Sequence, residues 1–213
     1  MVTSDGTHSE RSIALLEAID PVVKVESARS DFPPDLSPAA RAFLSEHATG
    51  KQLALIMSLP RGTPALYIDS DVLFFLGATE LARMQPTLGV PARYLGDCRL
   101  SADERLFRDP SEKESPINTG VLFLGGPLDW SESVARFDAL EGAPDFFTNQ
   151  TMTHLTMHAC GALPLDPAKY ILQLDDQFIY ADRHVRRETV LRHYVRPVRH
   201  KFWTTLANSR SSR

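Results

Sequence analysis

Apolar residues in this chain gather into short runs that are separated by polar, glycine- or proline-containing stretches. Two runs, Ala65–Ile68 and Val121–Leu124, are continuous. A continuous apolar run of this length is typical of a strand that is covered on both faces. β-Branched and apolar residues also predict strands over 22–25, 72–76 and 190–195.

Helices are predicted between these strands. Ser37 followed by Pro38 is typical of a helix start, because serine caps the first turn and proline fits the first helical position. We expect this helix to reach His47 and to be followed, after Gly50, by a second helix that ends before Pro60. The second helix is expected over 53–59, further helices over 13–18, 131–140 and 149–160, and loops over 32–34 and 96–116.

The alternation of strands with helices predicts a single α/β domain with a mostly parallel central sheet. A length of 213 residues suits one well-cored domain and is short for two. We expect residues 1–12 to be disordered, the domain to span 13–203, and residues 204–213 to form a frayed tail.

Composition excludes several classes of function. The formal net charge is −4 and the pI is near 6.0, so the chain lacks the overall basic character of a nucleic-acid-binding protein. Cys98 and Cys160 form no CxxC pair, so a zinc–thiolate site is not expected, and a reduced, cytoplasmic chain is the simplest interpretation. The polar N-terminus lacks the apolar core of a signal peptide, and no run approaches the roughly 20 apolar residues of a transmembrane segment.

The sequence Asp69-Ser70-Asp71 follows directly on the first buried run. Ligands of open α/β sheets bind outside the carboxyl ends of the strands, and two carboxylates one residue apart can converge on a hard divalent cation. Such a cation would neutralise a diphosphate leaving group and act as a Lewis acid. The alternative is that both aspartates are solvated at a turn.

Three further segments carry polar residues beside predicted elements. In the stretch HYVRPVRHKFW, His193 is suited to be a third metal ligand and Lys201 to contact phosphate, unless the stretch is only a basic surface loop. Asn118 can bind a sugar hydroxyl and Gly120 permits close backbone approach, unless they form an ordinary turn. Asn149 opens a predicted helix, of which it is alternatively only the N-cap.

In their order along the chain, these segments resemble the glycosyltransferase family that contains glycogenin and the bacterial lipopolysaccharide galactosyltransferases. That family has an apolar strand running into DxD, an asparagine-serine-glycine-like segment before a strand, an aspartate–glutamine pair opening a helix, and a final His-x-x-Gly-x-x-Lys-Pro-Trp. The corresponding stretches here, within roughly residues 50–203, are LYIDSDVLFF, INTGVLFLG, TNQTMTHL and HYVRPVRHKFW.

The resemblance implies a Rossmann-like GT-A domain that uses a nucleotide-sugar donor, a UDP-sugar in this family, with Mn²⁺ or Mg²⁺. Transfer to an acceptor, which would be a glycan, lipid or protein, would retain the anomeric configuration. The resemblance assigns metal binding to Asp69, Asp71 and His193, donor contacts to Asn118, Thr119, Gly120 and Lys201, and positions near the reacting sugar carbon to Asn149 and Gln150.

The chain also departs from the family pattern. Thr119 stands where serine is usual, and Asn149 replaces an aspartate, which removes a carboxylate from the reaction centre. The last motif has two extra residues before Lys201. Because only 68 residues precede Asp69, the βα unit that normally holds the nucleotide base is expected to be missing or rebuilt.

Two other functions fit parts of the sequence. In a haloacid-dehalogenase-like phosphatase, Asp69 would be the nucleophile and Asp71 an acid/base, with Asp175-Asp176 as a late acidic pair. That motif normally opens the fold, and this interpretation leaves the segment after His193 unexplained. A binding protein of the same fold without turnover is favoured by Asn149 and by the short front end.

The metal hypothesis makes a geometric prediction. Asp69 and His193 are more than 120 positions apart, so nothing local brings them together. A shared metal site requires Asp69, Asp71 and His193 to converge at one edge of the sheet, beside Asn118 and Gly120, with Lys201 approaching the same cleft.

Overall fold

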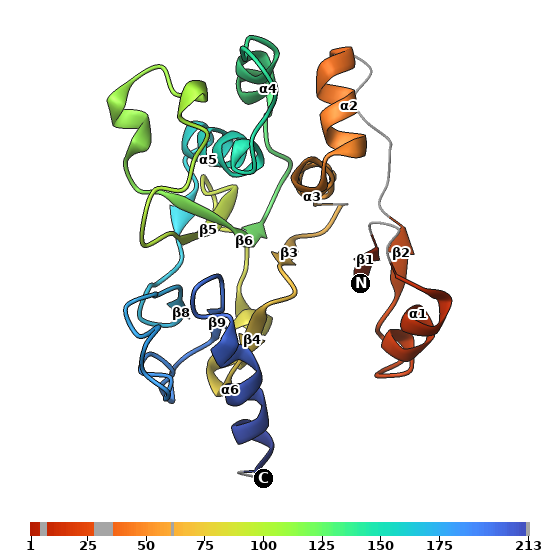
Figure 1. The fold of residues 1–213 in the computed structure, drawn as a ribbon, viewed down its shortest axis with the longest axis vertical. Helices are drawn as coiled ribbons and strands as arrows, with labels where there is room; N and C mark the ends of the chain where they lie inside the picture. Colours follow the sequence, from red (N-terminus) through yellow and green to blue (C-terminus); the bar gives the residue numbers. More distant parts are fainter. Residues whose placement is uncertain (5–7, 28–35, 61, 212–213) are drawn as a thin grey trace. The chain divides into compact units, whose positions relative to one another are not determined.

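The computed structural model of the chain describes residues 1–4, 8–27, 36–60 and 62–211 (Figure 1). They fall into two units, Met1–Ser58 and Leu59–Arg213. The sequence analysis places the ends of the domain at residues 13 and 203, which lie inside α1 (Glu10–Glu17) and α6 (His200–Ser211). The loop expected over 32–34 lies outside the described residues.

The first unit begins with a small βαβ arrangement. Strand β1 (Val2–Ser4) pairs in parallel with β2 (Val25–Ser27), and α1 lies between them in sequence. Ser9 caps α1 by accepting a hydrogen bond from the backbone of Ser12. The front end thus contains a small βαβ unit, and residues 2–4 and 10–12 of the stretch expected to be disordered lie in β1 and α1. The sequence gives little signal here because β1 has three residues, two of them polar.

Two helices complete this unit. In α2 (Pro38–Glu46), Ser37 accepts a hydrogen bond from the backbone of Ala40, as the sequence predicts. Helix α3 (Ala48–Met57) contains Gly50, which we expected to punctuate the chain. A Cβ there would lie 1.9 Å from the carbonyl oxygen of Phe43, so glycine permits the close packing of α3 on α2.

The second unit is built on a four-stranded sheet with the order β3-β6-β5-β7. The central strand β6 is antiparallel to both of its neighbours, and only β5 and β7 are parallel. The sheet is therefore mixed rather than mostly parallel. A continuous apolar run carries no information about strand direction. The burial on both faces that it predicts is found in β6 but not in β3, where Ala65 and Leu66 are partly exposed and Ile68 is exposed. The strands are β3 (Ala65–Ile68), β5 (Ala92–Gly96), β6 (Ile117–Leu124) and β7 (Leu163–Pro164).

A second sheet of three strands has the order β4-β9-β8. Strand β9 (Leu191–His193) is antiparallel to β4 (Val72–Phe74) and parallel to β8 (Tyr170–Ile171). A hydrophobic core joins the two sheets, since Val121 of β6 packs in the same cluster as Val72 and Leu191. This core fixes the end of β3 beside the end of β9.

Helices and 3-10 segments surround these sheets. Helix α5 (Thr148–Ala159) packs on β6, and α4 (Ser131–Asp138) packs on α5. The 3-10 segments are η1 (Leu76–Arg83), η2 (Glu104–Leu106) and η3 (Pro110–Lys113). Among the described residues, no helix has the length and apolar character needed to cross a bilayer.

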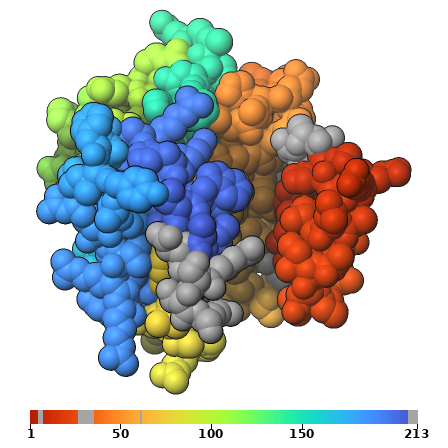
Figure 2. Space-filling model, turned by 60° about the horizontal axis from the view of Figure 1, so that its bottom comes forward, coloured from red at the N-terminus to blue at the C-terminus, as the bar shows by residue number. Residues whose placement is uncertain are grey.

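A buried ionic cluster ties α6 to the segment before β9. The carboxylate of Asp176 accepts hydrogen bonds from Arg192 at 2.9 Å and from Lys201 at 2.9 Å, and Lys201 also donates to the carbonyl of Ala181. Figure 2 shows the two segments, in lighter and darker blue, side by side. Burial raises the pKa of Asp176, but the hydrogen bond from Lys201 and the charge of Arg192 outweigh it and lower the pKa.

The segment over 96–116, expected to be a flexible loop, is fastened to α4. Arg136 donates to both carboxylate oxygens of Glu112, at 2.7 and 2.8 Å, and also to the carbonyl of Leu106. The hydrogen bonds of Arg136 lower the pKa of Glu112 to about 2.

The buried cluster predicts a large loss of stability on removal of one partner. Lys201→Met leaves the carboxylate of Asp176 short of a cation, so we expect unfolding to require about 3–5 kcal/mol less. Lys113→Met, at an exposed ion pair with Glu104, should cost less than about 1 kcal/mol. Urea unfolding followed by circular dichroism measures both. Equal effects of the two variants would contradict the assignment of the cluster.

The Glu112–Arg136 pair predicts a pH dependence. Because the pKa of Glu112 is lowered in the folded chain, its stabilising contribution is fully present above the unfolded value near 4.5 and is lost as pH falls towards 2. Glu112→Gln should therefore destabilise the chain at pH 6 and approach the wild type as the pH falls from about 4.5. Urea midpoints measured across this range test the prediction, and a difference independent of pH would contradict it.

Candidate metal centre

Two strand pairings bring the aspartates to His193. The backbone N–H of Asp69 donates to the carbonyl of Gly120, which extends the β3–β6 pairing beyond Ile68. Val72 stands opposite His193 in the β4–β9 pairing, and the N–H of Tyr194 donates to the carbonyl of Asp71. The register of both pairings therefore directs residues that are far apart in sequence to one place.

The three side chains form a compact cluster. Nε2 of His193 lies 2.9 Å from Oδ1 of Asp71 and 3.8 Å from Oδ2 of Asp69. The candidate ligand atoms of the three residues all lie within 4.8 Å of one another. His193 is buried while the aspartates are partly exposed, so the cluster is open on the carboxylate side. Tyr67 steadies Asp69 by donating to its Oδ1 at 2.7 Å.

Asn118 sets the protonation pattern of the histidine ring. Its Oδ1 accepts a hydrogen bond from the backbone of Gly120, and its Nδ2 donates to Asp97, so the orientation of the amide is fixed by its partners. Nδ1 of His193, 2.9 Å from this Oδ1, must therefore carry a proton. In the neutral ring the lone pair is then on Nε2, which faces the aspartates. This is the arrangement of a metal-binding histidine oriented by a second hydrogen bond.

The same geometry tests whether a cation fits. A neutral His193 would direct the lone pair of Nε2 at a carboxylate oxygen of Asp71 only 2.9 Å away, where two acceptors repel. Either a second proton on the ring or a cation shared by the two groups removes this repulsion. Two carboxylates and one imidazole are a donor set that suits a divalent cation. The residues present thus fit a metal ion.

Gly120 makes room for the histidine. A Cβ at this position would lie 2.0 Å from Cε1 and 2.6 Å from Nδ1 of His193, and 2.9 Å from Oδ1 of Asn118. No side chain larger than hydrogen fits between β6 and the ring. The predicted close approach at Gly120 is therefore an approach of the imidazole to the backbone.

Asp97 is a member of the site that the sequence analysis did not single out. Following β5, it accepts hydrogen bonds from Asn118 at 3.1 Å and from Gln150 at 3.5 Å. Gln150 also donates to the carbonyl of Ser101 at 2.9 Å. The only sequence signal for Asp97 is its place directly after the run Ala92–Gly96, at the carboxyl end of a strand.

Thr119 and Asn149 are both buried. Thr119 lies in β6 between Asn118 and Gly120, and the alternation of side chains along a strand turns it to the opposite face. Asn149 is the second residue of α5, whose N-cap position is occupied by Phe147. Asn149 is therefore not an N-cap.

Lys201 does not reach the cluster. Its ammonium is enclosed by Asp176 and the carbonyl of Ala181, away from Asp69 and Asp71. Arg199 is the basic residue at the site, where Nε and Nη2 donate to Oδ2 of Asp71 at 3.0 and 2.6 Å. The signal that finds it is spacing, because the basic residue of His-x-x-Gly-x-x-Lys stands six positions after the histidine, and Arg199 stands six after His193.

Asp71 is held in its charged form. Burial raises the pKa of its carboxyl group, but the hydrogen bonds and positive charges of His193 and Arg199 outweigh burial and lower the pKa. Asp71 therefore carries the negative charge that a metal ligand needs, and its oxygens are occupied by His193 and Arg199.

Comparison with known proteins finds similarity at the level of the fold. No protein-family model and no curated protein matches the chain. Among solved structures, a glycosyltransferase involved in the glycosylation of the major capsid of PBCV-1 matches with a TM-score of 0.50 and 14% identity, over 97% of this chain and 98% of its own. Mouse xyloside xylosyltransferase 1, in its apo form, matches with a TM-score of 0.50 and 14% identity, over 89% of this chain and 83% of its own.

The chain has a glycosyltransferase-like fold. The acidic pair that a phosphatase would require is located elsewhere, because Asp175 and Asp176 group with His184 rather than with the aspartates of DxD. Asp176 is also fully engaged by Arg192 and Lys201. In the part of the chain that the structure describes, Asp175 and Asp176 therefore do not serve as a second acidic pair beside Asp69.

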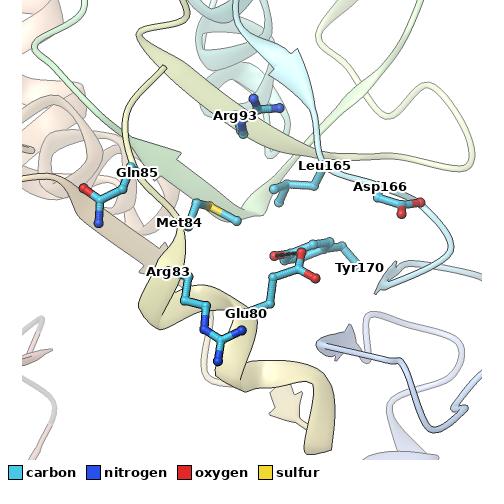
Figure 3. Close-up of a pocket in the computed structure, with 8 residues that line it drawn as sticks. All are labelled: Glu80, Arg83, Met84, Gln85, Arg93, Leu165, Asp166 and Tyr170. Carbon is cyan, nitrogen blue, oxygen red and sulfur yellow. Dashed lines mark hydrogen bonds between the residues drawn. The ribbon is translucent and has the colours of Figure 1, made fainter. Parts of the chain in front are cut away.

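A pocket of about 300 Å³ lies apart from the metal centre (Figure 3). Among its lining residues, Tyr170 donates a hydrogen bond of 3.3 Å to Glu80, and Arg93 comes from β5. None of the side chains of the metal centre lines it. The lining residues are Glu80, Arg83, Met84, Gln85, Arg93, Leu165, Asp166 and Tyr170.

The packing of Gly120 predicts a selective loss of metal binding. In Gly120→Ala the new methyl group must displace the ring of His193, so Mn²⁺ affinity measured by calorimetry should fall by about 10-fold or more. Gly126→Ala is the matched control, because a Cβ there would meet nothing within 4 Å. Circular dichroism identifies any variant that fails to fold. A folded Gly120→Ala with unchanged Mn²⁺ affinity would show that His193 is not a ligand.

Proposed function

We propose that this chain transfers a sugar from a nucleotide-diphosphate sugar to an acceptor in a metal-dependent reaction that retains the anomeric configuration. The observation that carries the proposal is the cluster of Asp69, Asp71 and His193, with the histidine oriented by Asn118, at the end of strand β3 in a glycosyltransferase-like fold. A UDP-sugar is the proposed donor, because the motifs resemble those of glycosyltransferases that use UDP-sugars.

The proposed metal ligands are Asp69, Asp71 and His193. The ion, Mn²⁺ or Mg²⁺, would neutralise charge on the diphosphate leaving group. Asn118 orients His193, and we propose that its amide also contacts a hydroxyl of the donor sugar. Arg199 takes the phosphate-binding role that the sequence analysis gave to Lys201, because it is exposed and lies beside Asp71.

Asp97 and Gln150 are proposed to hold the reacting sugar. The carboxylate of Asp97 and the amide of Gln150 are 3.5 Å apart and are linked through Asn118 to the metal ligands. Acceptor and amide groups at such a spacing suit the hydroxyls of a sugar ring. We propose that Asn149, at the first turn of α5, lies near the reacting carbon.

Binding without turnover is the second candidate. It is favoured by Asn149, whose amide cannot act as a nucleophile or base where the family pattern has a carboxylate. The two candidates share the metal centre and differ in whether the glycosidic bond of the donor is broken.

Donor turnover separates these candidates. Incubation with a panel of UDP-sugars in Mn²⁺ should release UDP, and Asp71→Asn should lower the rate by at least about 100-fold, since residues that merely orient ligands are worth about 10–100-fold. Asp175→Asn, an exposed aspartate outside the cluster, is the control and should leave the rate unchanged.

Each outcome has a distinct meaning. Mn²⁺-dependent binding of UDP-sugars without release of UDP would support the second candidate. Release of phosphate from a simple phosphoester, lost in Asp69→Asn, would contradict both and support a phosphatase. With an acceptor identified, the proton NMR coupling of the product's anomeric proton reports whether configuration is retained.

A further inference from the structure

Both carboxylate oxygens of Asp71 already have cationic or proton-bearing partners. Oδ1 faces Nε2 of His193 at 2.9 Å, and Oδ2 accepts two hydrogen bonds from Arg199, from Nε at 3.0 Å and from Nη2 at 2.6 Å. A divalent ion bound by Asp71 needs at least one of these oxygens. Because His193 is a proposed ligand of the same ion, Arg199 is the partner with which the ion competes.

Arg199 is placed so that its side chain can leave without disturbing the fold. The side chain is 56% exposed, whereas that of Asp71 is 15% exposed. Its neighbour Val198 is fully buried, and Lys201, two residues further on, is anchored in the buried cluster with Asp176. The backbone is thus held on both sides of Arg199, and rotation of one surface side chain suffices to free Oδ2.

We propose that Arg199 is an internal counter-ion that stands in for the metal ion and is transferred from Asp71 to the diphosphate of the donor when the ion binds. This inference rests on the proposed function. In the metal-free chain the guanidinium offsets the negative charge of Asp71. An incoming divalent ion displaces it by competing for Oδ2 and by repelling its positive charge. The displaced guanidinium remains beside the ion, where a diphosphate would bind both.

The exchange couples the two binding events. Metal binding frees Arg199 for diphosphate, and diphosphate removes Arg199 from Asp71, so each ligand raises the affinity of the other by the same factor. Direct contact between ion and diphosphate adds to this factor with or without Arg199. The contribution of Arg199 is therefore the part that disappears when the arginine is replaced.

Replacement of Arg199 should change the two affinities in opposite directions. In Arg199→Met we expect Mn²⁺ alone to bind about 2–5-fold more tightly, which is the range for loss of an exposed ion pair. Pyrophosphate, measured at saturating Mn²⁺, should bind about 10-fold more weakly, because charge-assisted hydrogen bonds to it are lost. Isothermal titration calorimetry of the full chain with MnCl₂ and then with pyrophosphate measures both.

Two variants serve as controls. Arg187→Met removes one positive charge from another exposed position and reports the effect of net charge alone. Arg199→Lys keeps the charge but loses the forked geometry of the guanidinium. Its affinities for Mn²⁺ and for pyrophosphate should therefore lie between those of the wild type and Arg199→Met.

The outcomes separate this inference from the proposed function. If the wild type binds no Mn²⁺, the proposed metal centre itself fails. If the wild type binds Mn²⁺ and Arg199→Met binds it equally or more weakly, the metal centre stands and the counter-ion role is wrong. If Arg187→Met reproduces both changes, they arise from net charge and the counter-ion role is again wrong.

Discussion

The imidazole of His193 is the point on which the site depends. One ring nitrogen faces Asn118 at 2.9 Å and the other faces Asp71 at 2.9 Å, so the ring links β6 to the loop after β3. Its position requires the absence of a side chain at Gly120 and the pairing of β9 with β4. Each of these conditions fixes the same ring, and together they turn Nε2 towards the aspartates.

Charge balance follows from that arrangement. Two aspartates beside a buried ring need positive charge nearby, and the chain supplies it from the exposed guanidinium of Arg199. The neighbouring lysine has a different task. Lys201 neutralises Asp176 inside the fold and so fastens the start of α6, which keeps Arg199 within reach of Asp71. Lys201, which is buried, thus supports the site by holding the backbone in place. Arg199, which is exposed and two residues away, supports it with its side chain.

The sequence predicts the parts of the fold that depend on local pattern. The strands β3 and β6 correspond to the two apolar runs, and the capped helix α2 corresponds to Ser37-Pro38. The expected burial on both faces is confirmed for β6 and is wrong for β3, whose Ile68 is exposed. Strand direction was missed, because burial on both faces reads the same in parallel and antiparallel sheets. The short strand β1 was missed because its pairing with β2 is not local and its three residues carry no pattern.

The sequence also predicts part of the candidate site, namely its candidate metal ligands. The candidate ligands could be named from DxD and from the late histidine, since metal ligation demands those residue types. Residue type favours Lys201 for the phosphate contact, whereas spacing from His193 favours Arg199. Asp97 lies in a polar stretch without any motif, and only the fold brings it to Asn118.

Anomalous diffraction from crystals soaked in Mn²⁺ tests the central claim most directly. The account predicts an anomalous peak that is coordinated by the carboxylate of Asp71 and by Nε2 of His193, with Asp69 beside it and the guanidinium of Arg199 no longer bonded to Oδ2 of Asp71. A peak at Asp175 and His184 instead, or no peak while Arg199 keeps its hydrogen bonds to Asp71, would contradict it.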